Sequence, residues 1–106
     1  MTTTRLDLFS EDHVALAAFA SALSHPARIM MVTLLQQREW VACGDIVEHI
    51  PLAQATVSQH LKVLVDVGLL SQRREKKKML YHLNCEKMKS FCHHFQCTLG
   101  TQTPES

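Results

Sequence analysis

The sequence predicts a mainly helical domain with one small β-hairpin near its C-terminal end. Apolar residues recur at helical spacing through residues 10–67 and again through 85–99, and between these stretches the pattern alternates with a period of two. The chain has 106 residues, a length that suits one domain. Hydrophobic residues make up 46% of the chain, which is enough for a core and argues against global disorder.

The first two helices are predicted from their starting signals. Ser10 is a good N-cap, and the two acidic residues after it suit the first turn of a helix that ends near residues 24–25. Pro26 fits the first position of a second helix, where its missing N–H costs nothing. Residues 26–37 are apolar almost all round, which predicts a buried helix.

Two further helices follow, and the second of them has two distinct faces. A short helix is expected over residues 44–50, because Pro51 stops it. The next helix is expected over residues 53–67, with Gly68 as its C-cap. Its apolar residues fall on one face, and short polar residues fall on the opposite face. The apolar residues are Val57, Leu61 and Leu64.

A basic hairpin and a last helix complete the chain. Residues 69–74 and 79–83 alternate as strands, and Glu75–Lys78 form the turn between them. The turn has no Asn-Gly or Asp-Gly pair, so its type is open. The last helix is expected over residues 85–99. The predicted order of elements is α-α-α-α-β-β-α.

The domain boundaries follow from composition. Residues 1–9 are expected to be an N-terminal arm, residues 10–99 the folded domain, and residues 100–106 a flexible polar tail. No apolar run approaches the roughly 18–20 residues needed to cross a bilayer. The first residues lack the basic-then-apolar order of a signal peptide, so we expect a cytoplasmic protein without a membrane partner.

The charge of the chain is small overall but unevenly distributed. The formal net charge is +1. Residues 1–50 hold three basic and six acidic side chains, a balance of −3, whereas residues 51–90 hold eight basic and three acidic ones, a balance of +5. The positive field is therefore local to the fourth helix and the hairpin, and a local basic surface is what phosphate contacts need.

A short helix, a tight turn and a polar-faced helix predict a helix–turn–helix, and the basic hairpin after it predicts the winged form. The second helix of such a motif enters the major groove, where Gln, Ser and Thr side chains meet base edges. We therefore predict that the partner is double-stranded DNA. The predicted DNA-contacting residues are Gln54, Thr56, Ser58, Gln59, His60, Lys62, Arg73, Arg74, Lys76, Lys77 and Lys78.

Other functions fit less well. A solvent-exposed helix face would explain the polar residues of the fourth helix, and a solvent-exposed turn would explain the basic residues of the hairpin. Neither explains both groups in this order. A cysteine-dependent enzyme would need a pocket and a base beside its thiolate, and a chain with three glycines offers little loop for either. A winged-helix adaptor that binds protein instead of DNA would not need the basic hairpin. We expect neither catalysis nor a small-molecule substrate.

Four stretches carry a family resemblance. The run from Ala22 to Met30, the run from Ala55 to Leu64, Gly68-Leu-Leu and Met79-Leu-Tyr-His-Leu resemble the ArsR/SmtB family of bacterial repressors. The resemblance covers roughly residues 12–99. It implies a dimeric repressor that occupies a palindromic operator and leaves it when a metal, metalloid or thiol-reactive effector binds.

The resemblance also implies that the first and last helices form the dimer interface. The sequence has an apolar stripe on each of these helices, and together they exceed what a core of this size buries alone. We therefore expect a homodimer. The predicted interface residues are Leu16, Phe19, Leu23, Met88, Phe91, Phe95 and Leu99.

The effector sites of the family match this chain only in part. Many metalloid sensors carry Cys-x-Cys-Asp at the start of the third helix, where this chain has a single Cys43. The zinc-type site on the last helix is not matched, since Cys85 and Lys87 stand at two of its positions. Persulfide sensors pair a cysteine of the second helix with one near the end of the last; Cys97 matches the latter, but Thr33 replaces the former.

The last helix nevertheless offers a cluster of soft donors. His93 and Cys97 are spaced i, i+4, and His94 and Cys97 are spaced i, i+3, so either pair can supply two ligands. Further ligands would come from Cys92, Cys43 or the other subunit. Cys85 and Cys92 share a face of the helix but lie about 10 Å apart along its axis, so these two cannot chelate one ion without another partner. Thiolates would select zinc, copper(I) or arsenic(III). Thiol redox sensing and plain packing of the cysteines remain open alternatives.

Overall fold

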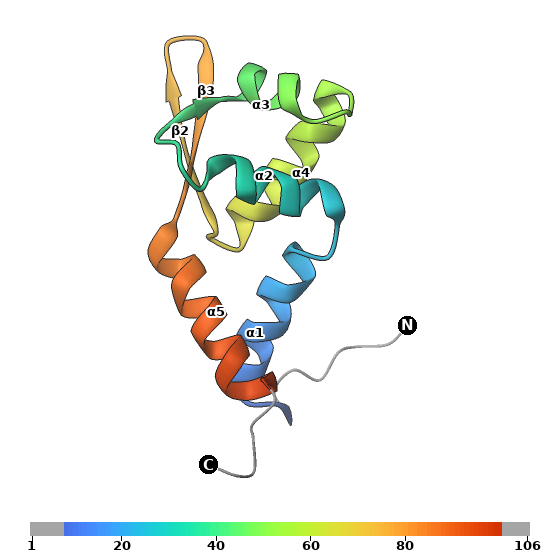
Figure 1. Ribbon diagram of the computed structural model, residues 1–106, viewed down its shortest axis with the longest axis vertical. Helices are drawn as coiled ribbons and strands as arrows, with labels where there is room; N and C mark the ends of the chain where they lie inside the picture. Colours follow the sequence, from blue (N-terminus) through green and yellow to red (C-terminus); the bar gives the residue numbers. More distant parts are fainter. Residues whose placement is uncertain (1–7, 101–106) are drawn as a thin grey trace.

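The computed structural model describes residues 8–100, which form five helices and a three-stranded antiparallel sheet (Figure 1). The observed order is α1, α2, β1, α3, α4, β2, β3, α5. Most of the predicted arm (1–9) and of the predicted tail (100–106) lies outside the described residues. The mainly helical fold with a β-hairpin is confirmed, and one short strand is added to it.

The first two helices begin at the predicted caps. In α1 (Glu11–Ala22) the hydroxyl of Ser10 accepts the backbone N–H of His13 at 3.1 Å. In α2 (Pro26–Leu35) the residue before Pro26 is the N-cap, and its imidazole accepts a backbone N–H at 3.0 Å. Both helices end two or three residues earlier than the sequence predicts. The predicted all-round burial of α2 is wrong, because Ile29 and Met30 are 45% and 44% exposed.

Within residues 8–100, no single helix is both long and apolar enough to cross a bilayer. Taken together, α1 and α2 have the length and apolar composition needed to cross a bilayer, but the pair bends by 93° at the break between them.

The helix–turn–helix consists of α3 (Cys43–His49) and α4 (Gln54–Asp66). Val57, Leu61 and Leu64 of α4 are fully buried, as the apolar spacing predicts. They belong to a core that also includes residues of α2, α3 and the sheet. After α4 the chain reverses at Gly68, whose φ of 89° lies in the left-handed region that favours glycine.

The sheet has the order β1-β3-β2, with β1 (Val41–Ala42), β2 (Leu70–Glu75) and β3 (Lys78–Leu83). The strand β1 was not predicted, since two residues carry no periodicity. Glu75 pairs with Lys78, so the predicted four-residue turn shortens to Lys76–Lys77. Lys76 has a φ of 58°, a value that a two-residue hairpin turn of type I′ or II′ requires at its first position. We call β2, β3 and this turn the wing.

The last helix α5 (Cys85–Leu99) has the predicted boundaries, and Asn84 caps it by accepting the backbone N–H of Lys87. It runs beside α1 at the end of the molecule opposite the wing (Figure 1). Phe91 meets Phe19 of α1 edge to face, with ring centroids 5.8 Å apart. We call α1 and α5 the helix-pair end, and α2–α4 with the sheet the reading end.

Candidate nucleic-acid interface

One face of α4 is polar and open to solvent. Gln54, Ser58, Gln59 and Lys62 are exposed, because the buried face of the helix lies opposite them. Thr56 is half-buried at the edge of this face. The ammonium of Lys62 lies 3.3 Å from a carboxylate oxygen of Asp66, and both side chains remain exposed. The structure therefore brings most of the predicted base-contacting residues onto one surface.

His60 is the exception among the predicted residues of α4. Its Nδ1 lies 2.9 Å from Nη1 of Arg28 on α2, and its ring centroid lies 4.4 Å from that of His25. The side chain is half-buried in this cluster. Sequence reasoning placed His60 with the base-contacting residues, but its side chain is held against α2.

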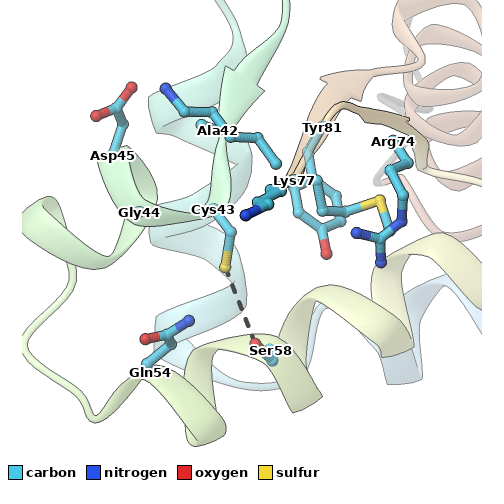
Figure 2. Close-up of a pocket in the computed structure, with 11 residues that line it drawn as sticks. Ala42, Cys43, Gly44, Asp45, Gln54, Ser58, Arg74, Lys77 and Tyr81 are labelled. Carbon is cyan, nitrogen blue, oxygen red and sulfur yellow. Dashed lines mark hydrogen bonds between the residues drawn. The ribbon is translucent and has the colours of Figure 1, made fainter.

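A cleft of about 440 Å³ separates the polar face of α4 from the wing (Figure 2). Gln54 and Ser58 line it from α4, and three cationic side chains of the wing line it from the other side. The start of α3 closes its third side. The cationic residues are Arg74, Lys77 and Lys78. Two predicted groups of DNA-contacting residues, which lie on different elements and are well separated in the sequence, thus share one concave surface.

Tyr81 lines this cleft and was not predicted. It lies on the central strand β3 and is only 7% exposed, yet its hydroxyl points into the cleft (Figure 2). Burial, and then the nearby Cys43 thiol, raise the pKa of Tyr81, so the hydroxyl stays protonated at neutral pH. A protonated phenol can donate to a phosphate oxygen. The alternation of β3 could have indicated which face Tyr81 occupies, but not the cleft before it.

Arg73 lies on the opposite face of the wing from Arg74, since successive strand residues point to opposite faces. Its guanidinium stacks over the Trp40 ring at 4.3 Å from the centroid and lies 3.7 Å from a carboxylate oxygen of Glu75. Trp40 also stacks on His82, with ring centroids 5.0 Å apart. The predicted cationic cluster is therefore divided between the cleft and the back of the wing.

The four cysteines are divided between the two ends of the molecule. Cys43 opens α3 at the cleft, where its sulfur lies 3.9 Å from the hydroxyl of Ser58. Cys85, Cys92 and Cys97 are exposed on α5. Of the donors predicted on α5, the structure brings together Cys97 and His93, whose Sγ and Nε2 lie 3.5 Å apart. Among residues 8–100, no three His, Cys, Asp or Glu side chains are arranged to hold a metal ion.

The predicted interface residues leave apolar surface exposed. Leu16 is buried and Phe19, Leu23, Met88 and Phe91 are half-buried, while Phe95 and Leu99 are 43% and 62% exposed. An apolar cleft of about 470 Å³ runs between α1 and α5. No residue of α5 is buried within the described chain.

Comparison with known proteins agrees with the fold. Residues 23–73 match a family model described as a helix-turn-helix domain. The chain is 39% identical over 71 residues to the arsenical resistance operon repressor of Staphylococcus xylosus, an alignment that covers 67% of each chain. It is 38% identical over 65 residues to the probable mercury resistance operon repressor of Streptomyces lividans, covering 61% of this chain and 51% of that one.

A solved structure extends the likeness to nearly the whole chain. The transcriptional repressor BigR from Xylella fastidiosa superposes with a TM-score of 0.67 and 29% identity, covering 94% of this chain and 100% of that chain. The helix–turn–helix, the wing and the flanking α1 and α5 are therefore shared with a known repressor. The chain belongs to the ArsR/SmtB family of winged helix–turn–helix repressors, which are DNA-binding regulators of transcription and not enzymes.

Proposed function

We propose that the protein represses transcription as a homodimer that places two copies of α4 on a two-fold symmetric DNA operator. One observation carries the proposal: the exposed polar face of α4 and the cations of the wing line the same cleft. DNA needs both kinds of group together, since base edges specify a site and phosphates position the protein.

The two walls of the cleft have different roles in this proposal. Gln54, Ser58 and Gln59 contact base edges, because they are exposed amides and hydroxyls at the start of the recognition helix. The cations of the wing contact phosphates and carry no sequence information. We assign His60 to a contact with Arg28 instead of a base edge, because its Nδ1 lies 2.9 Å from Nη1 of Arg28.

The dimer is supported by the helix-pair end. Phe95 and Leu99 are large, apolar and exposed on a helix that has no buried residue, and an apolar cleft runs beside them. Large contiguous apolar surface is uncommon on monomers and marks an interface. A second copy covering this surface through a two-fold axis would give an isologous dimer. Such a dimer presents two α4 helices, which explains a palindromic operator.

The proposal is tested with a duplex selected by the wild-type protein from a randomised pool, against a scrambled duplex of equal length. Gln59→Ala should weaken binding to the selected duplex by about 1–3 kcal/mol and leave the scrambled duplex nearly unaffected. Replacing Lys76, Lys77 and Lys78 with Ala should weaken both alike and lower the salt slope by about 0.9 for each phosphate that is no longer neutralised.

The control is Lys89→Ala, which removes one lysine charge from α5, outside the wing. This variant should bind both duplexes as the wild type does. If Gln59→Ala and the triple lysine variant weaken both duplexes equally with an unchanged salt slope, the assigned roles are wrong. A selected sequence without two-fold symmetry would contradict the dimeric arrangement.

We further propose that a soft metal, a metalloid or a thiol-reactive compound releases the repressor from DNA. The support is twofold. Two relatives are named as repressors of arsenical and mercury resistance operons, and α5 presents the thiol of Cys97 beside the imidazole of His93. Thiolate and imidazole together suit arsenic(III), mercury(II), copper(I) or zinc. One helix supplies two donors, and residues 8–100 bring no third donor beside them, so the second subunit would complete a trigonal or tetrahedral site.

Cysteine variants separate the possible effectors. The double variant Cys92→Ser, Cys97→Ser should bind the selected duplex normally but no longer respond to arsenite, mercury(II), copper(I) or zinc. Cys43→Ser is the matched control at the other end of the molecule, and it should still respond. A normal response of the double variant would place the sensor elsewhere. Release of the wild type by oxidants alone would indicate thiol redox sensing.

A further inference from the structure

A hydrogen-bonded link joins three helices at the corner where α1 turns into α2. Arg28, in the first turn of α2, donates from Nε to the carbonyl of Ala22, the last residue of α1, at 2.6 Å. Its Nη1 lies 2.9 Å from Nδ1 of His60 on α4. One guanidinium group therefore contacts both the end of α1 and the recognition helix. The corner that it spans bends by 93°.

The geometry determines the protonation state of His60. An arginine side chain has five N–H donors and no acceptor. Nδ1 of His60 must therefore accept the bond, so the ring is neutral and carries its proton on Nε2. A protonated ring would direct an N–H at the guanidinium and bring two positive charges together. The link thus requires neutral His60.

The surroundings of His60 favour this neutral form. The charged or titratable groups that face it are His25, from the connection between α1 and α2, and Arg28 from α2. Both are basic. Burial first, and then these two neighbours, lower the pKa of His60 below its ordinary 6.5. The ring of His25 is itself held in place, because its Nδ1 accepts the backbone N–H of Ala27 at 3.0 Å.

We propose that Arg28 and His60 are positioning residues for operator binding, whose bond holds α4 at a fixed orientation to the corner of α1 and α2 while His60 is neutral. The proposal rests on the proposed function, since it assumes that α4 reads the operator. It adds a connection between the two ends of the molecule, because α1 belongs to the helix-pair end. It also assigns to His60 a role other than base contact.

A pH dependence of defined sign follows. Because the pKa of His60 is lowered in the folded protein, the link is fully present above about pH 6.5 and is lost as the pH falls below it. Loss of the link should weaken sequence discrimination. Acidification also raises the net positive charge of the whole protein and strengthens binding to any duplex. The general strengthening cancels in the ratio of the affinities for the selected and scrambled duplexes, so a change in this ratio reports the loss of the link between Arg28 and His60.

The experiment measures this ratio between pH 8.0 and 5.5 for the full-length protein and three variants. His60→Asn places a neutral acceptor near the position of Nδ1 and cannot titrate. Arg28→Met removes the donor but keeps the length of the side chain. His49→Asn is the matched control: it removes an exposed helical histidine whose Nδ1 lies 2.9 Å from the Asp45 carbonyl of its own helix. Circular dichroism at each pH verifies folding.

The wild type and His49→Asn should lose discrimination about three- to tenfold between pH 7.5 and 5.5, the value of one lost hydrogen bond. His60→Asn should discriminate within about threefold of the wild type at pH 7.5 and show no loss on acidification. Arg28→Met should discriminate at least about fivefold less at pH 7.5, with a flat pH profile.

Parallel pH profiles of the wild type and His60→Asn would overturn the proposal. Normal discrimination by a folded Arg28→Met would overturn it as well, and if that variant fails to fold, the profile of His60→Asn decides alone. A wild-type protein that does not discriminate between the duplexes at pH 7.5 would instead contradict the proposed function. The two failures are therefore distinguishable.

Discussion

The reading end and the helix-pair end differ in how completely the chain buries its own apolar residues. In the reading end Met31, Ile46 and Leu64 are fully buried from three different helices. In the helix-pair end α5 has no buried residue, and its last apolar side chain, Leu99, is 62% exposed. The reading end therefore has a core that is buried within one chain, whereas the helix-pair end leaves apolar side chains exposed.

This difference shows how the two ends are stabilised. The core of the reading end is buried within one chain, so its stability does not depend on protein concentration. In the proposed dimer, the apolar surface of the helix-pair end is buried only by a second copy, so that part of the stability depends on concentration. Such a dimer would keep the surface proposed to bind DNA folded while its dimer contacts change.

One substitution in each end gives the strongest test of the difference in burial between the reading end and the helix-pair end. Leu64→Ala should lower the free energy of unfolding by about 2–5 kcal/mol, because it leaves a cavity in a fully buried site. Phe95→Ala should lower it by less than about 1 kcal/mol in dilute, monomeric protein, because that ring is 43% exposed. Urea denaturation at low protein concentration measures both. Equal losses would remove the distinction between the two ends.

Charges on the exposed stripe of α5 should separate dimerisation from folding. The double variant Phe95→Glu, Leu99→Glu should be monomeric, because each carboxylate would be buried in the interface. Its affinity for the selected duplex should fall about 100-fold, since two linked recognition helices bind more tightly than one. Sedimentation gives the mass and circular dichroism the fold. A dimer of normal mass would show that the interface lies elsewhere.

The junction between the two ends offers a smaller test at Gly68. Its φ of 89° is unfavourable for any residue with a Cβ, and an added Cβ would meet Nζ of Lys87 on α5 at 2.7 Å. Gly68→Ala should cost about 1–2 kcal/mol of stability, mainly from the backbone, since the lysine can move aside. Gly44→Ala is the control, because nothing lies within 4 Å of its added Cβ. Equal thermal stability of the two variants would contradict this account.

The smallest expected effect concerns the cleft in the reading end. Tyr81→Phe should weaken binding to both duplexes about three- to tenfold, the value of one hydrogen bond to phosphate. The salt slope and the melting temperature should stay unchanged, because the hydroxyl is uncharged and the ring remains buried. Fluorescence titration at three salt concentrations measures the slope. Wild-type affinity would mean that the hydroxyl makes no contact with DNA.

Regular elements were predictable from local chemistry. Both boundaries of α5 were predicted, and the structure shows that Asn84 caps its start. The buried face of α4 followed from the spacing of its apolar residues. The strand β1 was missed, since its two residues are defined by pairing with Leu80 and Tyr81 of β3 and not by any pattern of their own.

The site was predictable as a set of residues but not as an arrangement. Position on a helix placed His60 near the base-contacting residues, but its partner Arg28 lies 32 positions earlier in the chain. Arg73 and Arg74 are neighbours in sequence and belong to opposite faces of the wing. Tyr81 was predicted only as a strand residue. Its place at the cleft depends on how the sheet packs against α4, which the local sequence does not indicate. Contacts between distant segments decide the cases of His60 and Tyr81, whereas strand alternation alone separates Arg73 from Arg74.

The stacked arrangement on the back of the wing gives the protein an intrinsic optical reporter. Trp40 is the single tryptophan of the chain, and it stacks with both Arg73 and His82. Indole emission depends on neighbouring cations and imidazoles, so any displacement of β2 relative to β3 changes its intensity. Because the wing lines one side of the cleft proposed to bind DNA, this emission follows that surface without an added label. Time-resolved fluorescence of Trp40 can therefore report motion of the wing in solution.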